Sequence, residues 1–375
     1  MCAARLTEWC RIPTSGARAV EPFELDGMSL LAVPQLAYDL PGRPADMNGG
    51  DSDTDLLLLR RTPGGYEPFQ TLAVPGGEDA EFFRIGDRAF LATASIRRGR
   101  GPYEYATEST IYTWSGSRFE PFQAVAGFAA KQWRHFTVAE QHFLALAQGV
   151  ALPDTAPVNR PSLIFRWDGE AFRLSQEISS RWGYNWHAFS VGGQDFLAHA
   201  DHVEPSRLYR WDGGRFVVHQ EVAERHGRAF ATFHADGHDY LLVACLLSPS
   251  RLLRWDGDRF VDHQVLDGLG GRELAVLPGK HGPYVVRVNF ILGTREAPDT
   301  ALSSTLYQWH DEKLAVVGEF PTFGGTDVAV CADGQGPLVA VSNALSADVR
   351  FATDTVVYRF TEPAPRQRDR GRCAR

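Results

Sequence analysis

Cysteine is scarce in this chain of 375 residues, with five in all. The five do not have the spacing of a disulfide framework or of a zinc site, which argues against both. No stretch approaches the ~18 apolar residues of a membrane-spanning helix, and residues 1–16 contain no apolar core of a secretory leader. We therefore expect a cytoplasmic protein without a membrane span; the alternative is an extracellular protein whose leader is missing from the sequence.

Common catalytic motifs are missing as well. The sequence contains no Gly-x-Ser-x-Gly, no His-Glu-x-x-His and no Gly-rich phosphate loop. These absences argue against the usual serine hydrolases, zinc proteases and nucleotide-binding enzymes. They leave open an enzyme whose residues are scattered around a channel. The formal net charge of −8 argues against a nucleic-acid binder.

What the chain does have is a repeat. Trp-Asp-Gly occurs at Trp167, Trp211 and Trp255, each time with Phe five residues after the Trp. Weaker copies on both sides give anchors at positions 15, 61, 114, 167, 211, 255, 309 and 360, which bound seven intervals. A sequence unit that recurs at the spacing of these anchors indicates one supersecondary element that the chain repeats many times.

Each interval contains the pattern of four short strands. Residues 238–246 form a continuous apolar run, which is typical of a strand buried on both faces, and Asp256-Gly257 predicts a tight hairpin turn. Four-stranded units repeated radially make a propeller. The sequence therefore predicts an all-β, seven-bladed β-propeller of four-stranded antiparallel blades.

The ends of the chain predict how the propeller closes. The last unit supplies only three strands, whereas Ala19–Leu25 is a spare strand without a unit of its own. We expect this N-terminal strand to join the last blade. The resulting division is a flexible segment at 1–18, the propeller at 19–360 and a basic disordered tail at 361–375, where five arginines stand against two acidic residues.

Three motifs carry a family resemblance. They are an apolar-x-x-x-Gln-x-apolar stretch (172–178, with Gln176, and 216–222, with Gln220), a Gly-x-x-Phe-Leu-Ala run (193–198), and the aromatic-x-Trp-Asp-Gly turn. Together they resemble the epilepsy-associated repeat (EAR), also called the EPTP or epitempin repeat, of the leucine-rich glioma-inactivated proteins. The resemblance covers about residues 19–360 and implies a seven-bladed propeller that acts as a binding module. The Arg-, Ala- and Gly-rich, Lys-poor composition predicts a bacterial, stand-alone member.

Two ligand sites can be considered. In the Trp-Asp-Gly motif, the Trp and Asp could bind a sugar, or the Trp could pack between blades while the Asp bonds the turn backbone; we favour the structural interpretation. The first strands and the fourth unit offer a second candidate at the central channel. Its residues are Trp133, His135, Asn185, Trp186, His187, His199, Asp201 and His202. They could bind a substrate or a metal, or they could be ordinary hydrogen-bonded strand and loop ends.

Acidic residues near the starts of the first strands suggest a cation. Asp79, Glu81 and Asp327 are weak candidates as ligands. If they converge on the axis, their mutual repulsion would favour a bound calcium ion. No other cofactor is expected.

Longer inserts follow the second strand of four units, at 45–55, 97–109, 149–161 and 293–303. Because they occur at one point of the blade, we expect them on one face of the disc, where insertions in repeat proteins often bind partners. The sequence thus predicts a monomeric, non-enzymatic binding or scaffold propeller that contacts a protein partner through this face. The alternative is a channel-sited enzyme, hydrolase- or lactonase-like, or a binder of a small ligand or carbohydrate.

Overall fold

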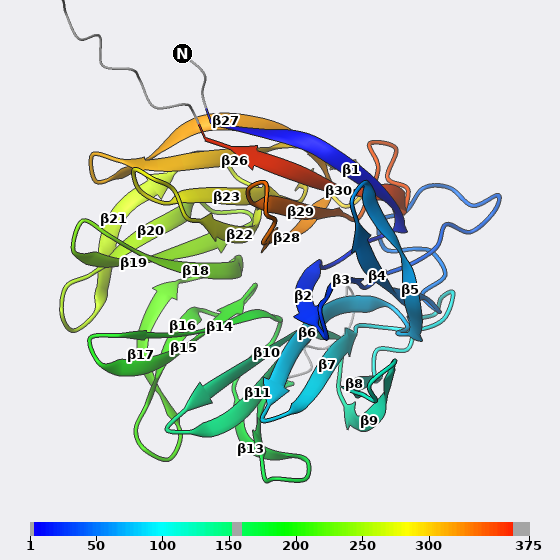
Figure 1. Cartoon of the computed structure of the whole chain (residues 1–375), viewed down its shortest axis with the longest axis horizontal. Coiled ribbons are helices and arrows are strands. Elements are labelled where there is room, and N and C mark those ends of the chain that lie inside the picture. Colours follow the sequence, from blue (N-terminus) through cyan, green and yellow to red (C-terminus); the bar gives the residue numbers. More distant parts are fainter. Residues whose placement is uncertain (1–3, 152–159, 363–375) are drawn as a thin grey trace, which may run out of the picture.

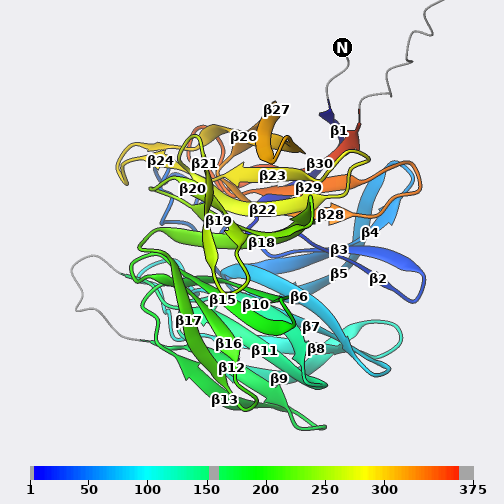
Figure 2. The same cartoon turned by 90° about the vertical axis from the view of Figure 1, so that its left-hand side faces the viewer.

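The computed structural model describes residues 4–151 and 160–362, and all the regular elements in this part are β-strands. Seven four-stranded sheets stand radially around a central channel (Figures 1 and 2). The predicted seven-bladed β-propeller is therefore confirmed. Within the same described part, no helix is long and apolar enough to cross a membrane.

In the first six blades the strands follow the chain from the channel outward. The strands of blades one to three are β2 (Glu21–Leu25), β3 (Met28–Val33), β4 (Asp55–Thr62), β5 (Gly65–Ala73); β6 (Gly77–Ile85), β7 (Arg88–Ser95), β8 (Glu108–Trp114), β9 (Phe119–Ala126); β10 (Ala130–Val138), β11 (Gln141–Gln148), β12 (Ser162–Trp167) and β13 (Phe172–Ile178). Those of blades four to six are β14 (Gly183–Val191), β15 (Gln194–Asp201), β16 (Ser206–Trp211), β17 (Phe216–Ala223); β18 (Gly227–Ala235), β19 (His238–Cys245), β20 (Ser250–Trp255), β21 (Phe260–Leu266); β22 (Gly271–Leu277), β23 (Tyr284–Asn289), β26 (Ala301–His310) and β27 (Lys313–Phe323). A short ribbon of β24 (Leu292–Gly293) and β25 (Pro298–Asp299) lies in the loop between β23 and β26.

The seventh blade is closed by the N-terminal strand, but not by the segment that the sequence predicts. Its strands are β28 (Gly325–Cys331), β29 (Leu338–Asn343), β30 (Ala352–Thr361) and β1 (Arg5–Ser15). β1 pairs with β30 from Arg5↔Thr361 to Ser15↔Ala352, which covers an edge that would otherwise be open.

Two of the predicted boundaries are therefore wrong. Residues 5–15 form the closing strand rather than a flexible segment, and the predicted closing segment contains β2, the innermost strand of the first blade. The sequence predicts residues 19–25 as an outermost strand because their Glu-Pro-Phe sequence at 21–23 is also found in the outermost strands β5 and β9. The predicted tail starts inside β30 at Thr361, and its residues from 363 onward lie outside the described residues.

The Trp-Asp-Gly motifs form structural hairpins. Asp168 Oδ1 accepts hydrogen bonds from the backbone N–H groups of Glu170 and Ala171, both at 2.8 Å. The equivalent carboxylates of Asp212 and Asp256 accept the same pair of bonds. The Trp167 ring packs between blades, 5.6 Å from the Phe90 ring centroid. These contacts support the structural interpretation of the motif over the sugar-binding one.

Glutamines of the outermost strands join neighbouring blades. Gln220 of β17 donates from Nε2 to the carbonyl of Phe260 (2.7 Å), and its Oε1 accepts from the Phe260 N–H (2.9 Å). The same two-bond clamp occurs at Gln70, Gln123, Gln176 and Gln264. This clamp explains the fixed Gln of the repeat, because each amide satisfies two backbone groups of the next blade.

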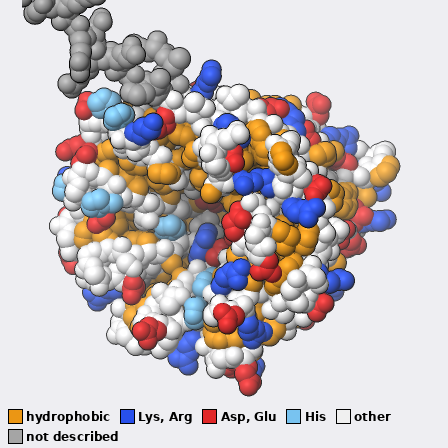
Figure 3. Space-filling view, viewed as in Figure 1, with side chains coloured by type: hydrophobic (Ala, Val, Ile, Leu, Met, Phe, Trp, Pro, Cys, Tyr) orange, Lys and Arg blue, Asp and Glu red, His pale blue; other side chains and the backbone are white. Residues whose placement is uncertain are grey.

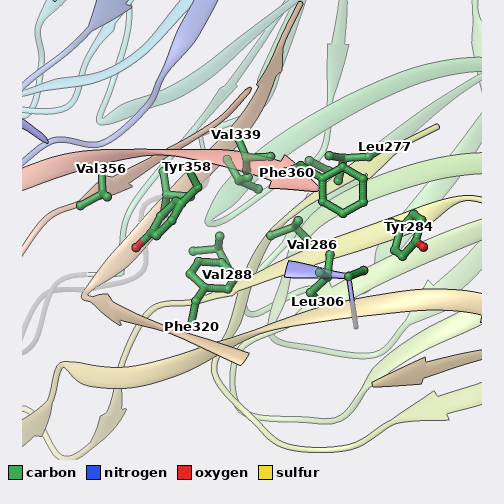
Figure 4. Packing of buried hydrophobic residues seen from close by; sticks show 14 residues of the cluster. Leu277, Tyr284, Val286, Val288, Leu306, Phe320, Val339, Val356, Tyr358 and Phe360 are labelled. Atoms are coloured by element: carbon green, nitrogen blue, oxygen red, sulfur yellow. The ribbon is translucent and has the colours of Figure 1, made fainter. Parts of the chain in front are cut away.

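Apolar side chains fill the spaces between blades. In the cluster between blades six and seven, Val286 and Val288 of β23 lie with Val339 of β29 and Tyr358 of β30 (Figure 4). The three valines are fully buried. Because the second strand of each blade packs against neighbours on both sides, its apolar run is continuous rather than alternating.

Candidate functional site in the central channel

The seven innermost strands surround a cavity of about 350 Å³. Figure 3 looks onto the face formed by the β-hairpins, and the centre of this face is hollowed, with charged side chains of both signs around the hollow. We call this side the hairpin face. The opposite side, where strands two and three of each blade are connected, is called the loop face.

A β-bulge near the start of the innermost strands supplies the first layer of the channel. In β14, for example, the pairing with β15 shifts between Gly183 and Asn185, which leaves Tyr184 as the extra residue. The same shift occurs in β6, β10, β18, β22 and β28. A bulge re-aims the extra side chain. The resulting layer, here called the bulge ring, also includes the residue at the corresponding place before β2 and consists of Arg18, Glu78, Lys131, Tyr184, Arg228, Arg272 and Thr326. All of these residues except Arg228 line the cavity.

The bulge ring carries four cationic side chains and one carboxylate, and all of them are buried. Glu78 Oε2 accepts from Arg18 Nε at 3.1 Å, and its Oε1 lies 3.3 Å from Lys131 Nζ. Burial acts to raise the pKa of Glu78, but the charges of Arg18 and Lys131 outweigh it and hold the pKa below its usual value. Glu78 is therefore ionised and neutralises part of the positive charge.

Tyr184 lies under the remaining cations. The Arg228 guanidinium carbon is 3.7 Å from the centroid of the Tyr184 ring, and that of Arg272 is 5.1 Å away. Burial lowers the pKa of Arg228 to about 10. Nε and Nη1 of Arg228 and Nε of Arg272 have no hydrogen-bond partner among the described residues. This end of the channel thus holds buried positive charge with free donors.

The predicted metal ligands line the channel, but their oxygens are engaged with backbone. Asp79 Oδ2 accepts from the Trp133 N–H (2.7 Å), Glu81 Oε1 from His135 N–H (2.8 Å), and Asp327 Oδ2 from Val20 N–H (2.8 Å). Each carboxylate therefore satisfies the free edge of the next blade's innermost strand. Burial raises the pKa of Asp79 and of Asp327.

Within residues 4–151 and 160–362, no group of three or more His, Cys, Asp or Glu side chains is arranged to hold a metal ion. The channel calcium ion therefore stays a prediction, without a ligand cluster in the described residues to support it.

The structure places two of the predicted ligand residues in the channel. Asn185 donates from Nδ2 to Glu273 Oε2 (3.2 Å), and His187 Nε2 lies 3.1 Å from Thr232 Oγ1. Burial lowers the pKa of His187 to about 3, so the imidazole is neutral at physiological pH.

Three other predicted residues lie between blades. The indoles of Trp133 and Trp186 are fully buried there, and Trp133 Nε1 donates to the Thr93 carbonyl (3.0 Å). The His135 ring stacks on Phe83, with 4.4 Å between the ring centroids. None of these three is a lining residue of the cavity.

The remaining three predicted residues lie in or next to loops, away from the cavity lining. His199 Nε2 lies 3.0 Å from Ser162 Oγ, and the His202 ring packs edge-on against Trp182. Asp201 holds two loops together, because its carboxylate accepts from the Ser180 hydroxyl and from the N–H groups of residues 181, 182, 203 and 204. The group of residues in the fourth unit therefore does not converge on one site.

Sequence reasoning missed the cationic part of the bulge ring. A signal for it existed, because each ring residue from the second blade onward except Lys131 directly follows a glycine at the start of its strand. The direction of the side chain at that position depends on the β-bulge, and the bulge cannot be detected from the alternation of apolar and polar residues.

The predicted inserts emerge together on the loop face. Arg97, after β7, donates to the carbonyls of Asn48 and Gly49 in the loop after β3, both at 2.6 Å. Thr300 in the loop after β23 donates to Ser346 in the loop after β29 (2.7 Å). Val150, where the remaining insert begins, packs on the same apolar cluster as Ile96 and the other loop residues. The prediction of a common face is confirmed for the described parts of the inserts.

Comparison with known proteins agrees with the geometry. The model of the EPTP domain matches residues 118–168, 171–212 and 215–256. This chain carries EPTP repeats. Each matched stretch begins at or next to an outermost strand and ends after the third strand of the next blade. The EPTP repeat is thus offset from the blade, and this offset is the reason why a strand from the N-terminus closes the ring.

Two relatives match part of this chain. A thrombospondin-type laminin G domain and EAR repeat-containing protein from Mus musculus is 28% identical over 169 residues, or 44% of this chain and 24% of the relative. Its counterpart from Homo sapiens is 31% identical over 140 residues, or 36% of this chain and 20% of the relative. The chain thus matches no more than about a quarter of the length of these proteins.

Proposed function

We propose that this EPTP-repeat propeller is a monomeric, non-enzymatic binding module that contacts a protein partner through its loop face. The observation that carries the proposal is the cross-connection of the inserts. Arg97 is buried and joins two of them through three hydrogen bonds, to Ser52 Oγ and to the carbonyls of Asn48 and Gly49. Long loops that are held by a rigid scaffold are where repeat proteins usually bind.

The loop face also carries exposed apolar side chains. Leu247, in the loop between β19 and β20, is 49% exposed, and Leu269, between β21 and β22, is 41% exposed. The two loops are joined because Gly270 N–H donates to the Leu246 carbonyl (2.7 Å). Exposed apolar side chains of this kind supply the buried centre of a protein interface.

The test compares two double variants on opposite surfaces. Leu247→Asp with Leu269→Asp alters the loop face. Leu174→Asp with Val218→Asp alters the outer rim, where the two side chains are 53% and 61% exposed. Immobilised wild-type protein and both variants are used to capture proteins from lysate of the source organism, with quantification by mass spectrometry. We expect a specific set of partners to be lost about tenfold from the loop-face variant only.

Equal capture by all three proteins, or a loss only from the rim variant, would refute the loop face as the binding surface. Circular dichroism and urea unfolding of the variants show whether they remain folded.

A channel-sited hydrolase or lactonase has less support. His187 is the one predicted histidine at the cavity, its imidazole is engaged with Thr232, and its low pKa makes it a poor general base near neutral pH.

A further inference from the structure

The channel end at the bulge ring has the chemistry of an anion site. We propose that the channel binds a small molecule carrying a carboxylate or phosphate group, and that this oxyanion lies against the guanidinium group of Arg272, which lines the cavity beside Tyr184. Arg228, which lies over the same tyrosine ring, adds positive charge next to this point. This site is separate from the loop face and is independent of the function proposed above.

The first argument is the balance of buried charge. Glu78 is shared by Arg18 and Lys131, with contacts of 3.1 and 3.3 Å. The carboxylate nearest to Arg272 is that of Glu273, at a long 3.9 Å. Arg228 is 3% exposed and has no ion pair among the described residues. A buried charge without a counter-charge is costly, so an incoming anion would gain from both guanidinium groups.

The second argument concerns hydrogen-bonding capacity. The carboxylates that line the channel already accept bonds, as Asp79 does from Trp133 N–H and Glu21 Oε1 does from Phe82 N–H (3.0 Å). The unpartnered buried atoms around the channel, among the described residues, are donors: Nε of Arg134, Nε and Nη1 of Arg228, and Nε of Arg272. Because free donors require an acceptor, an oxyanion would satisfy these atoms and a cation would not.

The third argument is the shape of the channel. A volume of about 350 Å³ lies within the range of small-molecule sites. An apolar cluster of loop residues lies on the loop-face side of the bulge ring, where the Arg18 guanidinium carbon is 5.4 Å from the centroid of the Phe290 ring. A ligand would therefore enter from the hollow of the hairpin face (Figure 3) and place its anionic end deepest, with the rest of the molecule beside His187 and Thr232.

The experiment uses inorganic phosphate and succinate as probes, titrated separately into the full chain by isothermal calorimetry at low ionic strength. The variants are Arg228→Gln and Arg272→Gln, which keep most of the side-chain volume and remove the charge. Arg287→Gln is the matched control, because Arg287 is also buried and has free Nε and Nη1 atoms. Its guanidinium carbon lies 5.7 Å from the ring centroid of Tyr307, which does not line the cavity, whereas Arg228 and Arg272 lie over Tyr184, which does.

We expect saturable binding of at least one probe to wild type and to Arg287→Gln, with binding weakened about tenfold or more in Arg228→Gln and in Arg272→Gln. The probe that binds more tightly distinguishes a phosphate site from a carboxylate site. Absence of saturable binding of both probes to wild type at millimolar concentrations overturns the proposal. Equal affinity in wild type and in the two channel variants also overturns it. If one channel variant fails to fold, as judged by circular dichroism, the other decides.

Discussion

The glutamine clamp between blades makes a direct prediction about stability. In Gln220→Leu, a side chain of similar size replaces the amide that bonds both the N–H and the carbonyl of Phe260. Phe260 is 2% exposed, so water has little access to the two groups that lose their partner. The change therefore leaves a buried donor and a buried acceptor unsatisfied while it preserves apolar contact.

The size of the effect follows from these two groups. A buried polar group left without a partner costs about 1–3 kcal/mol, and we expect a loss of about 2–4 kcal/mol in the free energy of unfolding. Urea unfolding followed by tryptophan fluorescence measures it, because the nine Trp residues include Trp255 in the adjoining strand. Gln220→Glu should also lose stability, because its carboxylate can still accept from the Phe260 N–H but places an acceptor oxygen against the Phe260 carbonyl, where Gln220 has a donor.

Gln141→Leu is the control for adding an apolar side chain, because Gln141 is exposed at a hairpin and makes no clamp. We expect this control to remain within about 0.5 kcal/mol of wild type. If Gln220→Leu is as stable as the control, the clamp contributes nothing to the joining of blades and the explanation of the Gln in the repeat is wrong.

Two further changes test the loop face and the channel. Arg97→Met removes the hydrogen bonds to the carbonyls of Asn48 and Gly49. We expect amide hydrogen exchange of residues 45–54 to become at least about tenfold faster, while the urea midpoint changes less than in Gln220→Leu. Unchanged exchange would show that Arg97 does not order the loop. Burial, together with the nearby Asp327, raises the pKa of Glu273 to about 8. Between about pH 5 and pH 8 the folded state therefore holds a proton that the unfolded state has released. The free energy of unfolding must then fall as pH rises through this range. Glu273→Gln should remove the part of this decline that Glu273 contributes, so the stability of the variant relative to wild type should increase between about pH 5 and pH 8. A stability difference that is independent of pH would contradict the raised pKa.

Much of the fold could be predicted from the sequence because the repeated residues have local roles. The Asp of Trp-Asp-Gly closes its own turn, and the apolar runs of the second strands follow from burial on both sides. The closing strand could not be located in this way. Glu21-Pro22-Phe23 has the sequence of an outermost strand yet occupies the innermost position, because the pairing of β1 with β30 is a contact between the two ends of the chain.

The candidate site was predicted less well, for a related reason. His199 and Asp201 are near His187 in sequence, but the second strand runs from the hairpin face to the loop face, so their side chains end among the loops while His187 stays at the channel. Conversely, Arg18 and Arg272 are far apart in the chain and line the same cavity only because the ring closes. Which side chains lie close together across the channel depends on the closure of the ring of blades, and a local sequence pattern contains no information about that closure.

The bulge ring shows where a propeller of this repeat can vary without loss of the fold. A glycine precedes the bulge in every bulged innermost strand except β10, where Ala130 stands. Packing restricts two of these glycines, because a Cβ on Gly227 would lie 2.1 Å from Ser206 Oγ, and one on Gly271 would lie 2.6 Å from Ser250 Oγ. The next residue, by contrast, is glutamate, tyrosine, arginine or threonine in different blades, with the same backbone. The backbone thus fixes where these side chains point and leaves their chemistry free. The charge at the deep end of the channel is therefore a property of this particular chain, not of the repeat, and it is there that a ligand specific to this protein would bind.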